Sequence, residues 1–405
     1  MLTWKVAVRN ILRQKRRTIL TMLTMFGGFT LAAISIAWSD GTYNSIIDLF
    51  TRNQLGHIQI HREGYLDRPS LYKTIDDYGA VGRKIEQVAG LEDWTPRVYA
   101  AGLTSVGEKS AGARIIGIDP SRENATTRFA GKITTGRSFS TPAAHEAILG
   151  KGLAKILKAG IGDSIVIVTQ GADGSIANDL YAIIGIVESG DEMSDRTALY
   201  LHLHDAQELL VLGKRVHEIV IVADRLQGVR GLTARIIAAL GDPTLAVAPW
   251  PEFARSFYVA MKADQQGSWI MLFIIVLVVA VGVLNTVLMT VMERRREYGL
   301  LRAIGTRPGQ IVRLVLSETV VMAIISVLIG VAVSLVINYL LSLKGIALPE
   351  PITYGGVEFT TMKTEINARS LYIPALAVVV VAVLVSIVPA VKAARMAPAR
   401  VMRMQ

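Results

Sequence analysis

Four long apolar runs constrain the fold of this chain more than any other feature. They cover residues 18–38, 268–292, 319–341 and 371–391, and none of them contains Asp, Glu, Lys or Arg. A helix of 21 residues, as in the first run, is about 32 Å long and matches the roughly 30 Å hydrocarbon core of a bilayer. The alternative is four core helices of a soluble protein. The length of the runs, in a chain that is 51% hydrophobic, favours membrane spans.

Positive charge is concentrated beside these runs. Residues 1–17, 293–317 and 392–405 together hold 16 Lys and Arg against two acidic residues, although the net charge of the whole chain is only +10. Cytoplasmic loops of membrane proteins carry such an excess, so we expect both termini and the 293–317 segment in the cytoplasm. A nucleic-acid-binding protein would need a basic patch on a folded surface, and we expect no nucleic-acid partner.

The segment between the first two runs is long enough to form a domain of its own. Its strand patterns cover 57–61, 113–118, 164–170, 180–188, 197–203 and 217–224, and its helix patterns cover 80–90, 151–160 and 226–240. The predicted fold class is therefore a membrane α-helical protein with four transmembrane helices and a large extracytoplasmic α+β domain inserted between helices 1 and 2.

These patterns divide the chain into nine parts. In order, we expect a cytoplasmic amphipathic helix (1–17), transmembrane helix 1 (18–38), the extracytoplasmic domain with helical stalks (39–267), transmembrane helix 2 (268–292), a cytoplasmic helix and loop (293–317), transmembrane helix 3 (318–343), an extracytoplasmic loop (344–370), transmembrane helix 4 (371–391) and a cytoplasmic tail (392–405).

Both links between the domain and the membrane have helical patterns. Residues 45–50 continue the first span, and residues 251–269 lead into the second. In the second link Phe253, Phe257 and Met261 recur every four residues, which places them on one face of a helix. These side chains are expected either to pack under the domain or to form a paired stalk that carries movement.

The chain lacks the motifs of an enzyme. It has no cysteine, no G-x-x-x-x-G-K phosphate loop, no H-E-x-x-H and no G-x-S-x-G. His202 and His204 would share a face of a strand, and Asp191, Glu192 and Asp195 form an acidic cluster. Surface histidines and solvated turns are commoner than metal sites, so we expect no metal and no catalytic residue.

Polar residues are scarce within the spans. Asn285 lies in the second span, where an amide is expected to seek a hydrogen-bond partner on another helix. Glu318 stands at the boundary of the third span. An ion-coupled transporter usually carries ionisable groups inside its spans, so the energy for any transport is expected from elsewhere.

The segment after the second span has an unusual density of charge. In ERRREYGLLRAIG (293–305), Arg294, Tyr298 and Arg302 fall on one helical face, and Leu300, Leu301 and Ile304 supply apolar contact. A helix that only enforces membrane topology would explain the arginines. It would not explain the leucines or the GTRPG turn that follows.

This segment resembles the characteristic motif of FtsX-like ABC-transporter permeases. The matching positions are Asn285, Met289, Glu293, Arg294, Glu297, Gly299, Arg302, Ala303 and Gly305. The order of one span, a large outer domain and three more spans is similar to that family, as are EAILGKGLAKILKAGIGDSIVI (146–167) and the ending PAVKAARMAPARVMR (389–403). MacB-type exporters, LolC/LolE-type lipoprotein-release subunits and the cell-division permeases belong to this family.

The resemblance implies a permease subunit without a cofactor of its own. ATP and Mg would be bound by a separate cytoplasmic ABC ATPase in two copies, and a second permease, identical or sister, would complete the assembly. The resemblance leaves open whether an extracytoplasmic adaptor or acceptor protein also belongs to the assembly. The ATPase-coupling residues would be Glu293, Arg294, Glu297, Tyr298, Gly299, Leu301, Arg302 and Gly305. Their proposed role is to contact the ATPase. The resemblance also implies a multi-pass protein of the bacterial inner membrane.

Two functions follow from the resemblance. The first is transport, for lipoprotein or lipid release or for export, driven by motion of the outer domain. The alternative is a transmembrane regulator that activates a cell-wall hydrolase. Regulators of that type have a much smaller outer domain than residues 39–267, which favours transport.

The predicted topology can be tested with one cysteine, because the natural chain has none. Asp173→Cys, in the outer domain, should react with a membrane-impermeant maleimide in whole cells whose outer membrane, if present, is permeabilised. Labelling only after lysis would contradict the predicted orientation. A cysteine at Thr306, on the cytoplasmic side, is the matched control and should react only after lysis.

Overall fold

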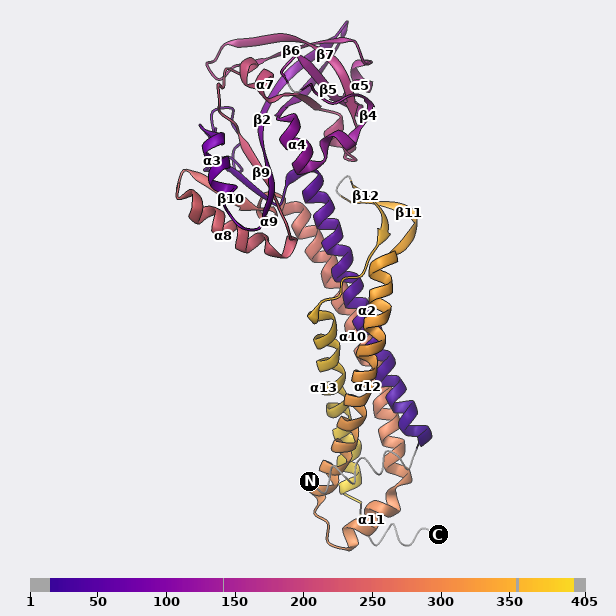
Figure 1. Cartoon of the computed structure of the whole chain (residues 1–405). Coiled ribbons are helices and arrows are strands. Elements are labelled where there is room, and N and C mark those ends of the chain that lie inside the picture. The colour runs from indigo at the N-terminus through magenta and orange to yellow at the C-terminus, as the bar shows by residue number, and fades with distance from the viewer. Residues whose placement is uncertain (1–14, 141, 355–356, 397–405) are drawn as a thin grey trace. The chain divides into compact units, whose positions relative to one another are not determined.

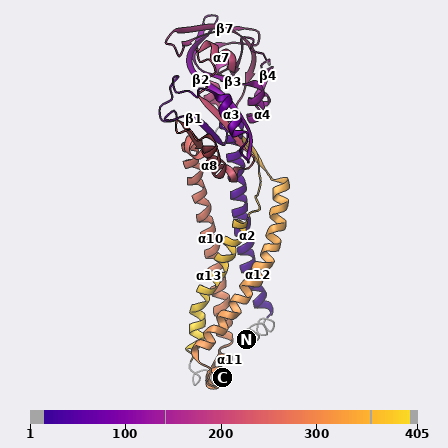
Figure 2. The ribbon, with the colours of Figure 1, turned by 60° about the vertical axis from the view of Figure 1, so that its left-hand side comes forward.

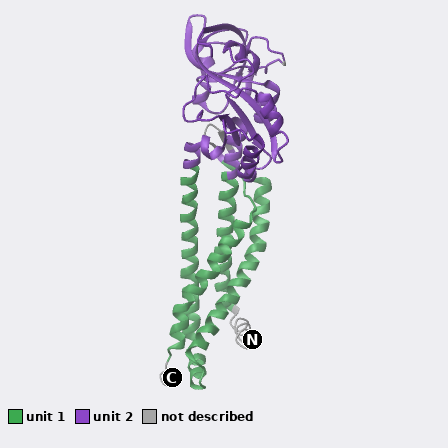
Figure 3. Ribbon diagram, turned by 90° about the vertical axis from the view of Figure 1, so that its left-hand side faces the viewer, with its two compact units in different colours: residues 1–43, 261–348, 361–405 green, residues 44–260, 349–360 purple. Residues whose placement is uncertain are grey.

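The computed structural model describes residues 15–140, 142–354 and 357–396. The chain divides into two compact units (Figure 3). Residues 1–43, 261–348 and 361–405 form the first, here called the helical unit, and residues 44–260 and 349–360 form the second, the α/β unit. The predicted amphipathic helix lies outside the described residues apart from 15–17, as does the tail beyond 396.

Helices and strands follow the order shown in Figure 1. The helices are α2 (Lys15–Phe50), α3 (Tyr78–Ile85), α4 (Pro120–Thr127), α5 (Lys151–Leu157), α6 (Glu192–Asp195), α7 (Leu203–Leu209), α8 (Val229–Leu240), α9 (Trp250–Phe253), α10 (Arg255–Glu293), α11 (Arg295–Ala303), α12 (Pro308–Lys344) and α13 (Ala368–Ala394). Shorter turns are η1 (Thr51–Leu55), which is π-helical, and the 3₁₀ turns η2 (Phe129–Lys132) and η3 (Leu226–Gly228).

The strands are β1 (Ile58–Arg62), β2 (Leu91–Val106), β3 (Lys109–Ile118), β4 (Ile133–Gly136), β5 (Glu146–Gly150), β6 (Ser164–Gln170), β7 (Ile176–Val187), β8 (Ala198–His202), β9 (Glu218–Ala223), β10 (Leu245–Pro249), β11 (Ile346–Tyr354) and β12 (Val357–Met362). Strands β11 and β12 pair as a hairpin within the segment that the sequence pattern gave only as a loop.

Four helices of the described chain are long and apolar enough to cross a membrane, namely α2, α10, α12 and α13. They run alongside one another in the helical unit (Figures 1 and 2). Many of their large apolar side chains point away from the bundle, as expected for helices whose solvent is lipid. Each helix also contains polar residues that flank its apolar run, so it is longer than the run itself.

Close packing between α2 and its neighbours depends on glycine. A Cβ at Gly28 would lie 2.0 Å from a methyl group of Val279 on α10, and one at Gly330 on α12 would lie 2.4 Å from the ring of Phe29. Further along the pair of α2 and α10, the hydroxyl oxygen of Ser39 lies 3.1 Å from that of Ser268, and the hydroxyl of Tyr43 donates to Asp264 at 2.7 Å. Small residues let membrane helices approach closely, where dispersion replaces the hydrophobic effect as the driving force.

The inward face of α12 is a stripe of small and polar residues that the sequence analysis did not identify. It consists of Glu318, Ser326, Gly330, Ser334 and Asn338, all buried. The recurring spacing of four residues was the available signal. Beside this stripe, the hydroxyls of Thr319 and Ser386 on α13 lie 3.2 Å apart, which joins two helices by a hydrogen bond inside the apolar unit.

The α/β unit is built on one mixed ten-stranded sheet. Its order is β10-β1-β9-β2-β3-β8-β5-β7-β4, and β6 pairs with both β2 and β7. The double pairing of β6 closes β2, β3, β8, β5, β7 and β6 into a ring. Strands β10, β1 and β9 extend the sheet from the first half of β2, so β2 belongs to both halves of the unit.

All six predicted strands and all three predicted helices of this unit are present, with small shifts of their ends. The longest strand, β2, was missed. Its sequence LEDWTPRVYAAGLTSV contains Pro96, Gly102 and the charged Arg97, which hide the period-two pattern. Arg97 is nevertheless buried, because it pairs with Glu123.

The predicted stalk stripe is only partly correct. Phe257 is buried and its ring stacks on Phe50 at a centroid distance of 4.0 Å, and Met261 is also buried. Phe253, however, belongs to the separate short helix α9. Ala254 departs from helical geometry with φ −102° and ψ 44°, which ends α9 and breaks the four-residue repeat before α10 begins.

The glycine contacts give a stability test with a neighbouring control. Gly28→Leu should lower the melting temperature of the purified protein, because overpacking a tight contact costs about 1–3 kcal/mol. Gly27→Leu should have little effect, since nothing lies within 4 Å of a Cβ at that position. Equal melting temperatures for the two variants would contradict the packing described for α2 and α10.

Candidate functional site

The predicted coupling segment forms the separate helix α11, between α10 and α12 (Figure 1). Helix α10 ends at Glu293, and Arg294 takes a non-helical conformation with φ −88° and ψ 17°. At the other end Gly305 has φ +97°, a left-handed conformation that glycine adopts without strain. Pro308 then occupies the first turn of α12, where its missing N–H has no cost. Two sharp turns therefore define this helix.

A buried ion pair joins the start of α11 to α12. One terminal nitrogen of Arg294 lies 3.1 and 3.0 Å from the two carboxylate oxygens of Glu318, and Nε donates to Glu297 at 2.7 Å. Arg294 and Glu318 are each only 8% exposed. Removing one partner of a buried pair strands the other charge and costs about 3–5 kcal/mol.

Tyr298 packs beneath this pair. It is completely buried, and the guanidinium of Arg294 lies 5.2 Å from the centre of its ring, within cation–π range. Burial, followed by the nearby Glu318 carboxylate, raises the pKa of the Tyr298 hydroxyl. Gly299 is buried beside it. The tyrosine is therefore a neutral packing residue of the bundle.

The face shared by Arg294, Tyr298 and Arg302 turns inward, although a role in contacting the ATPase implied that it would point outward. Arg302 is half-buried, with one terminal nitrogen 3.4 Å from the carbonyl oxygen of Thr306. Leu301 packs against the core of the helical unit and is not available as a surface contact. Helical spacing gives residues that share a face, but the burial of that face depends on the Glu318 carboxylate on another helix.

The outward face of α11 carries two large apolar side chains among charges. Leu300 is 56% exposed and Ile304, at the end of the helix, is 75% exposed. Arg295 and Arg296 are exposed on the preceding turn, as are Glu293 and Glu297. An apolar pair surrounded by charges is the composition of a protein-contact surface. Gly305 is also exposed, as part of the turn.

Asn285 does not hold this bundle together. Its side chain is exposed on α10, so the expected contact with another helix of the same chain is absent from the described structure. The buried polar contacts come instead from α12 and α13, as described above. The ion-pair partner of Arg294, Glu318, could not be assigned from the sequence, where the only signal was an acidic residue at the edge of an apolar run.

The histidine pair and the acidic cluster have local structural roles. Strand β8 ends at His202, whose Nδ1 accepts a hydrogen bond from the backbone of His204 at 3.2 Å, so the two rings do not share a strand face. Asp191 caps α6, and buried Asp195 accepts from the backbone of Ser189. Within the described ranges no group of three His, Asp or Glu side chains is placed to hold a metal.

The ion pair can be tested with a double-mutant cycle. Arg294→Met and Glu318→Met should each lower the melting temperature strongly, because each leaves a buried charge without its partner. The double variant should regain much of the loss, since it buries two apolar side chains of similar length. Additive losses measured by thermal unfolding in detergent would contradict a direct coupling.

Comparison with known proteins identifies the family. Residues 18–239 match the MacB-like periplasmic core domain and residues 269–398 match the FtsX-like permease C-terminal domain. Lipoprotein-releasing system transmembrane protein LolC of Neisseria meningitidis is 23% identical over 82% of this chain and 81% of its own length. LolC of Xylella fastidiosa is 23% identical over 97% and 96%.

A macrolide export ATP-binding/permease protein, MacB 2 of Aeromonas hydrophila, is 24% identical over 84% of this chain and 53% of its own length. Permeases of this kind are multi-pass proteins of the bacterial inner membrane that act with a cytoplasmic ATPase. The two family domains together cover both the outer domain and the three C-terminal spans. The chain belongs to the FtsX-like permeases with a MacB-like periplasmic core domain, and is an ABC-transporter permease of the LolC/MacB type.

Proposed function

We propose that this permease couples ATP hydrolysis by a separate cytoplasmic ATPase to motion of its extracytoplasmic domain. The observation that carries the proposal is the outward face of α11, with exposed Leu300 and Ile304 among charged side chains. A partner that buried these two side chains would gain about 1.5–3 kcal/mol for each one fully buried. No phosphate loop occurs in the sequence, so ATP and Mg are assigned to the partner.

Force applied to this face would enter the bundle through the buried ion pair. Arg294 links α11 to Glu318 of α12, and α10 is one continuous helix from Arg255 to Glu293. A helix whose hydrogen bonds are unbroken is a stiff element, so displacement of α11 would move its neighbours rather than bend them. Six further residues are proposed to take part in coupling by supporting α11 and its turns. They are Glu293, Glu297, Tyr298, Gly299, Arg302 and Gly305.

Release of a lipoprotein or another lipid-linked cargo is the proposed transport reaction. Its support is the similarity to two LolC proteins, over 82% and 97% of the chain. We place both termini and α11 in the cytoplasm, because the basic residues gather there. The charge pattern and the domain order together support this orientation.

The working assembly is proposed to contain two ATPase subunits and a second permease, identical or sister. Exposed Asn285 on α10 is a candidate contact for that permease, since an amide in lipid is stabilised by a hydrogen bond across helices. An extracytoplasmic adaptor or acceptor would receive the cargo. Neighbouring genes encoding an ATPase and a sister permease would support this arrangement.

The ATPase contact can be tested on the exposed face. Leu300→Asp and Ile304→Asp should abolish co-purification of the ATPase and its cargo-dependent stimulation, because each puts a charge into an apolar contact. The permease itself should remain folded, since both side chains are exposed. The readouts are ATP hydrolysis and recovery of the ATPase with the tagged permease.

Ile237→Asp is the matched control, because Ile237 is similarly exposed on α8 of the α/β unit. It should leave both readouts unchanged. Leu301→Asp is a contrasting variant that should destabilise the bundle, as Leu301 is partly buried against its core. Normal ATPase recovery with both α11 variants would mean that this helix serves only as a membrane anchor.

A further inference from the structure

The α/β unit contains a large cavity that the coupling function leaves unexplained. Its volume is about 620 Å³, within the range of small-molecule sites. Apolar walls come from Leu55 at the end of η1, from Leu66 and Leu71 after β1, and from Phe253 on α9. On β2 the cavity reaches the stretch 99–101, between the residues that pair with β9 and those that pair with β6. The cavity therefore lies where the two halves of the sheet meet.

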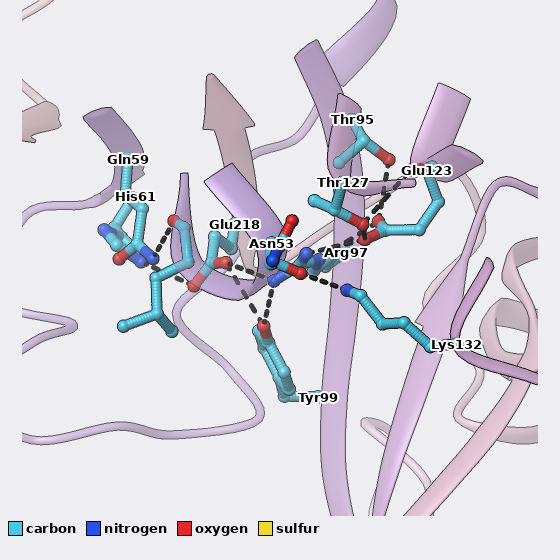
Figure 4. Close-up of polar contacts among 11 residues, drawn as sticks. Asn53, Gln59, His61, Thr95, Arg97, Tyr99, Glu123, Thr127, Lys132 and Glu218 are labelled. Atoms are coloured by element: carbon cyan, nitrogen blue, oxygen red, sulfur yellow. Dashed lines mark hydrogen bonds and ion pairs between the residues drawn. The ribbon is translucent and has the colours of Figure 1, made fainter. Parts of the chain in front are cut away.

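A carboxylate lies at the polar end of this cavity. Glu218, on β9, is buried, yet it lines the cavity. One of its oxygens accepts a hydrogen bond from the Tyr99 hydroxyl at 3.2 Å, and the other lies 3.1 Å from Nε2 of His61 (Figure 4). A carboxylate offers about four lone-pair sites. Each oxygen of Glu218 can therefore accept one further hydrogen bond.

The nearest positive charge is committed elsewhere. The guanidinium of Arg97 binds both oxygens of Glu123, at 2.6 and 3.1 Å, whereas its closest approach to Glu218 is 3.6 Å. Figure 4 shows Arg97 between the two carboxylates, with Lys132 on the Glu123 side. Glu123 also accepts from Thr127 at 2.7 Å. Arg97 thus mainly neutralises Glu123, and Glu218 is only weakly paired.

His61 does not supply the missing charge. Its ring is buried, and Nδ1 has no hydrogen-bond partner within the described structure. A protonated ring would place an N–H donor at Nδ1 with nothing to accept it, which is unfavourable in a buried site. The neutral tautomer with a proton on Nε2 donates to Glu218 and leaves Nδ1 as an unpaired acceptor.

Arg114, the other charged side chain that lines the cavity, is held at its edge. It is exposed, and its guanidinium donates to the hydroxyl of Ser194 at 2.7 Å. The cavity thus offers a buried anion at one end, apolar walls, and aromatic rings from Tyr65, Tyr99 and Phe253 that can face a cation. An ammonium group would add a hydrogen-bonded cation to the Glu218 carboxylate, which the Arg97 guanidinium approaches only to 3.6 Å.

We propose that this cavity, lined by Glu218, Tyr99, Leu66 and Phe253, binds an amphiphilic amine, with the ammonium group on Glu218 and the apolar body between the leucines and Phe253. The ammonium donates to the free lone pairs of the carboxylate. Leu55 lines the wall and is the last residue of the π-helical turn that ends α2, so an occupied cavity also contacts the end of the first stalk. This site goes beyond the proposed ATPase coupling and does not depend on it.

The test uses the full chain in phosphatidylcholine nanodiscs and two probes of equal length, 4-phenylbutylamine and 4-phenylbutan-1-ol. Calorimetric titration, corrected with empty nanodiscs, should give saturable binding of the amine at least tenfold tighter than that of the alcohol. Glu218→Gln keeps the shape of the side chain and should remove the preference for the amine. Equal affinities of the wild-type protein for the two probes would overturn the proposal.

A second variant avoids the buried network. Leu66→Arg places a cation at the exposed wall of the cavity and should weaken binding of the amine at least tenfold, whereas Leu180→Arg, a similarly exposed leucine on β7 outside the cavity, should not. Unchanged binding in Leu66→Arg would contradict the assigned site. Displacement by lysophosphatidylethanolamine would identify a lipid head group as the amine source, and displacement by Leu-Leu-amide a peptide amino terminus. The assay contains no ATPase, so its failure would leave the coupling proposal intact.

Discussion

The buried pair between Arg294 and Glu318 determines how α11 is held against α12. Two charges removed from water are stable only when each satisfies the other, and here both oxygens of the carboxylate contact one guanidinium nitrogen. The pair fixes the break after α10 and turns Tyr298 and Leu301 into the bundle. Leu300 and Ile304 are then directed outward by helical geometry alone. The exposure of Leu300 and Ile304 thus follows from the inward direction of Arg294 and Tyr298.

Much of the helical unit could be predicted because a segment that crosses a lipid bilayer must be apolar. Runs without charge give spans, and basic flanks give an expected orientation, whatever the details of packing. The direction of α11 could not be predicted in this way. Spacing showed that Arg294, Tyr298 and Arg302 share a face. An arginine on a short helix outside the apolar runs is expected to be exposed unless a buried partner is known. That partner, Glu318, lies 24 positions away in the sequence.

The α/β unit shows the same limit on a larger scale. Strands with an unbroken run of β-branched residues, such as β6 and β9, were predictable. Strand β2 instead contains a proline, a glycine and an arginine that no local rule assigns to a buried strand. Arg97 is acceptable there because Glu123 on α4 accepts two hydrogen bonds from it. The cavity beside Glu218 was equally out of reach, since its walls come from β1, β2, β9, α9 and the loops between them. Sites assembled from distant segments depend on tertiary contacts that a single sequence does not display.

In each unit a cationic side chain lies near the end of a long helix. Arg294 follows the last residue of α10, and Lys132 donates to the carbonyl oxygen of Asn53 in the π-helical turn that ends α2. The last carbonyl groups of a helix lack intrahelical donors and carry partial negative charge, so a cation is favourable there. Lys132 donates to such a carbonyl group, whereas Arg294 binds the carboxylates of Glu297 and Glu318. Burial lowers the pKa of Lys132 to about 8, partly opposed by Glu123, so the lysine still carries its proton at neutral pH. Helix ends held in this way resist fraying, and a displacement imposed at one end is less readily lost in local unwinding.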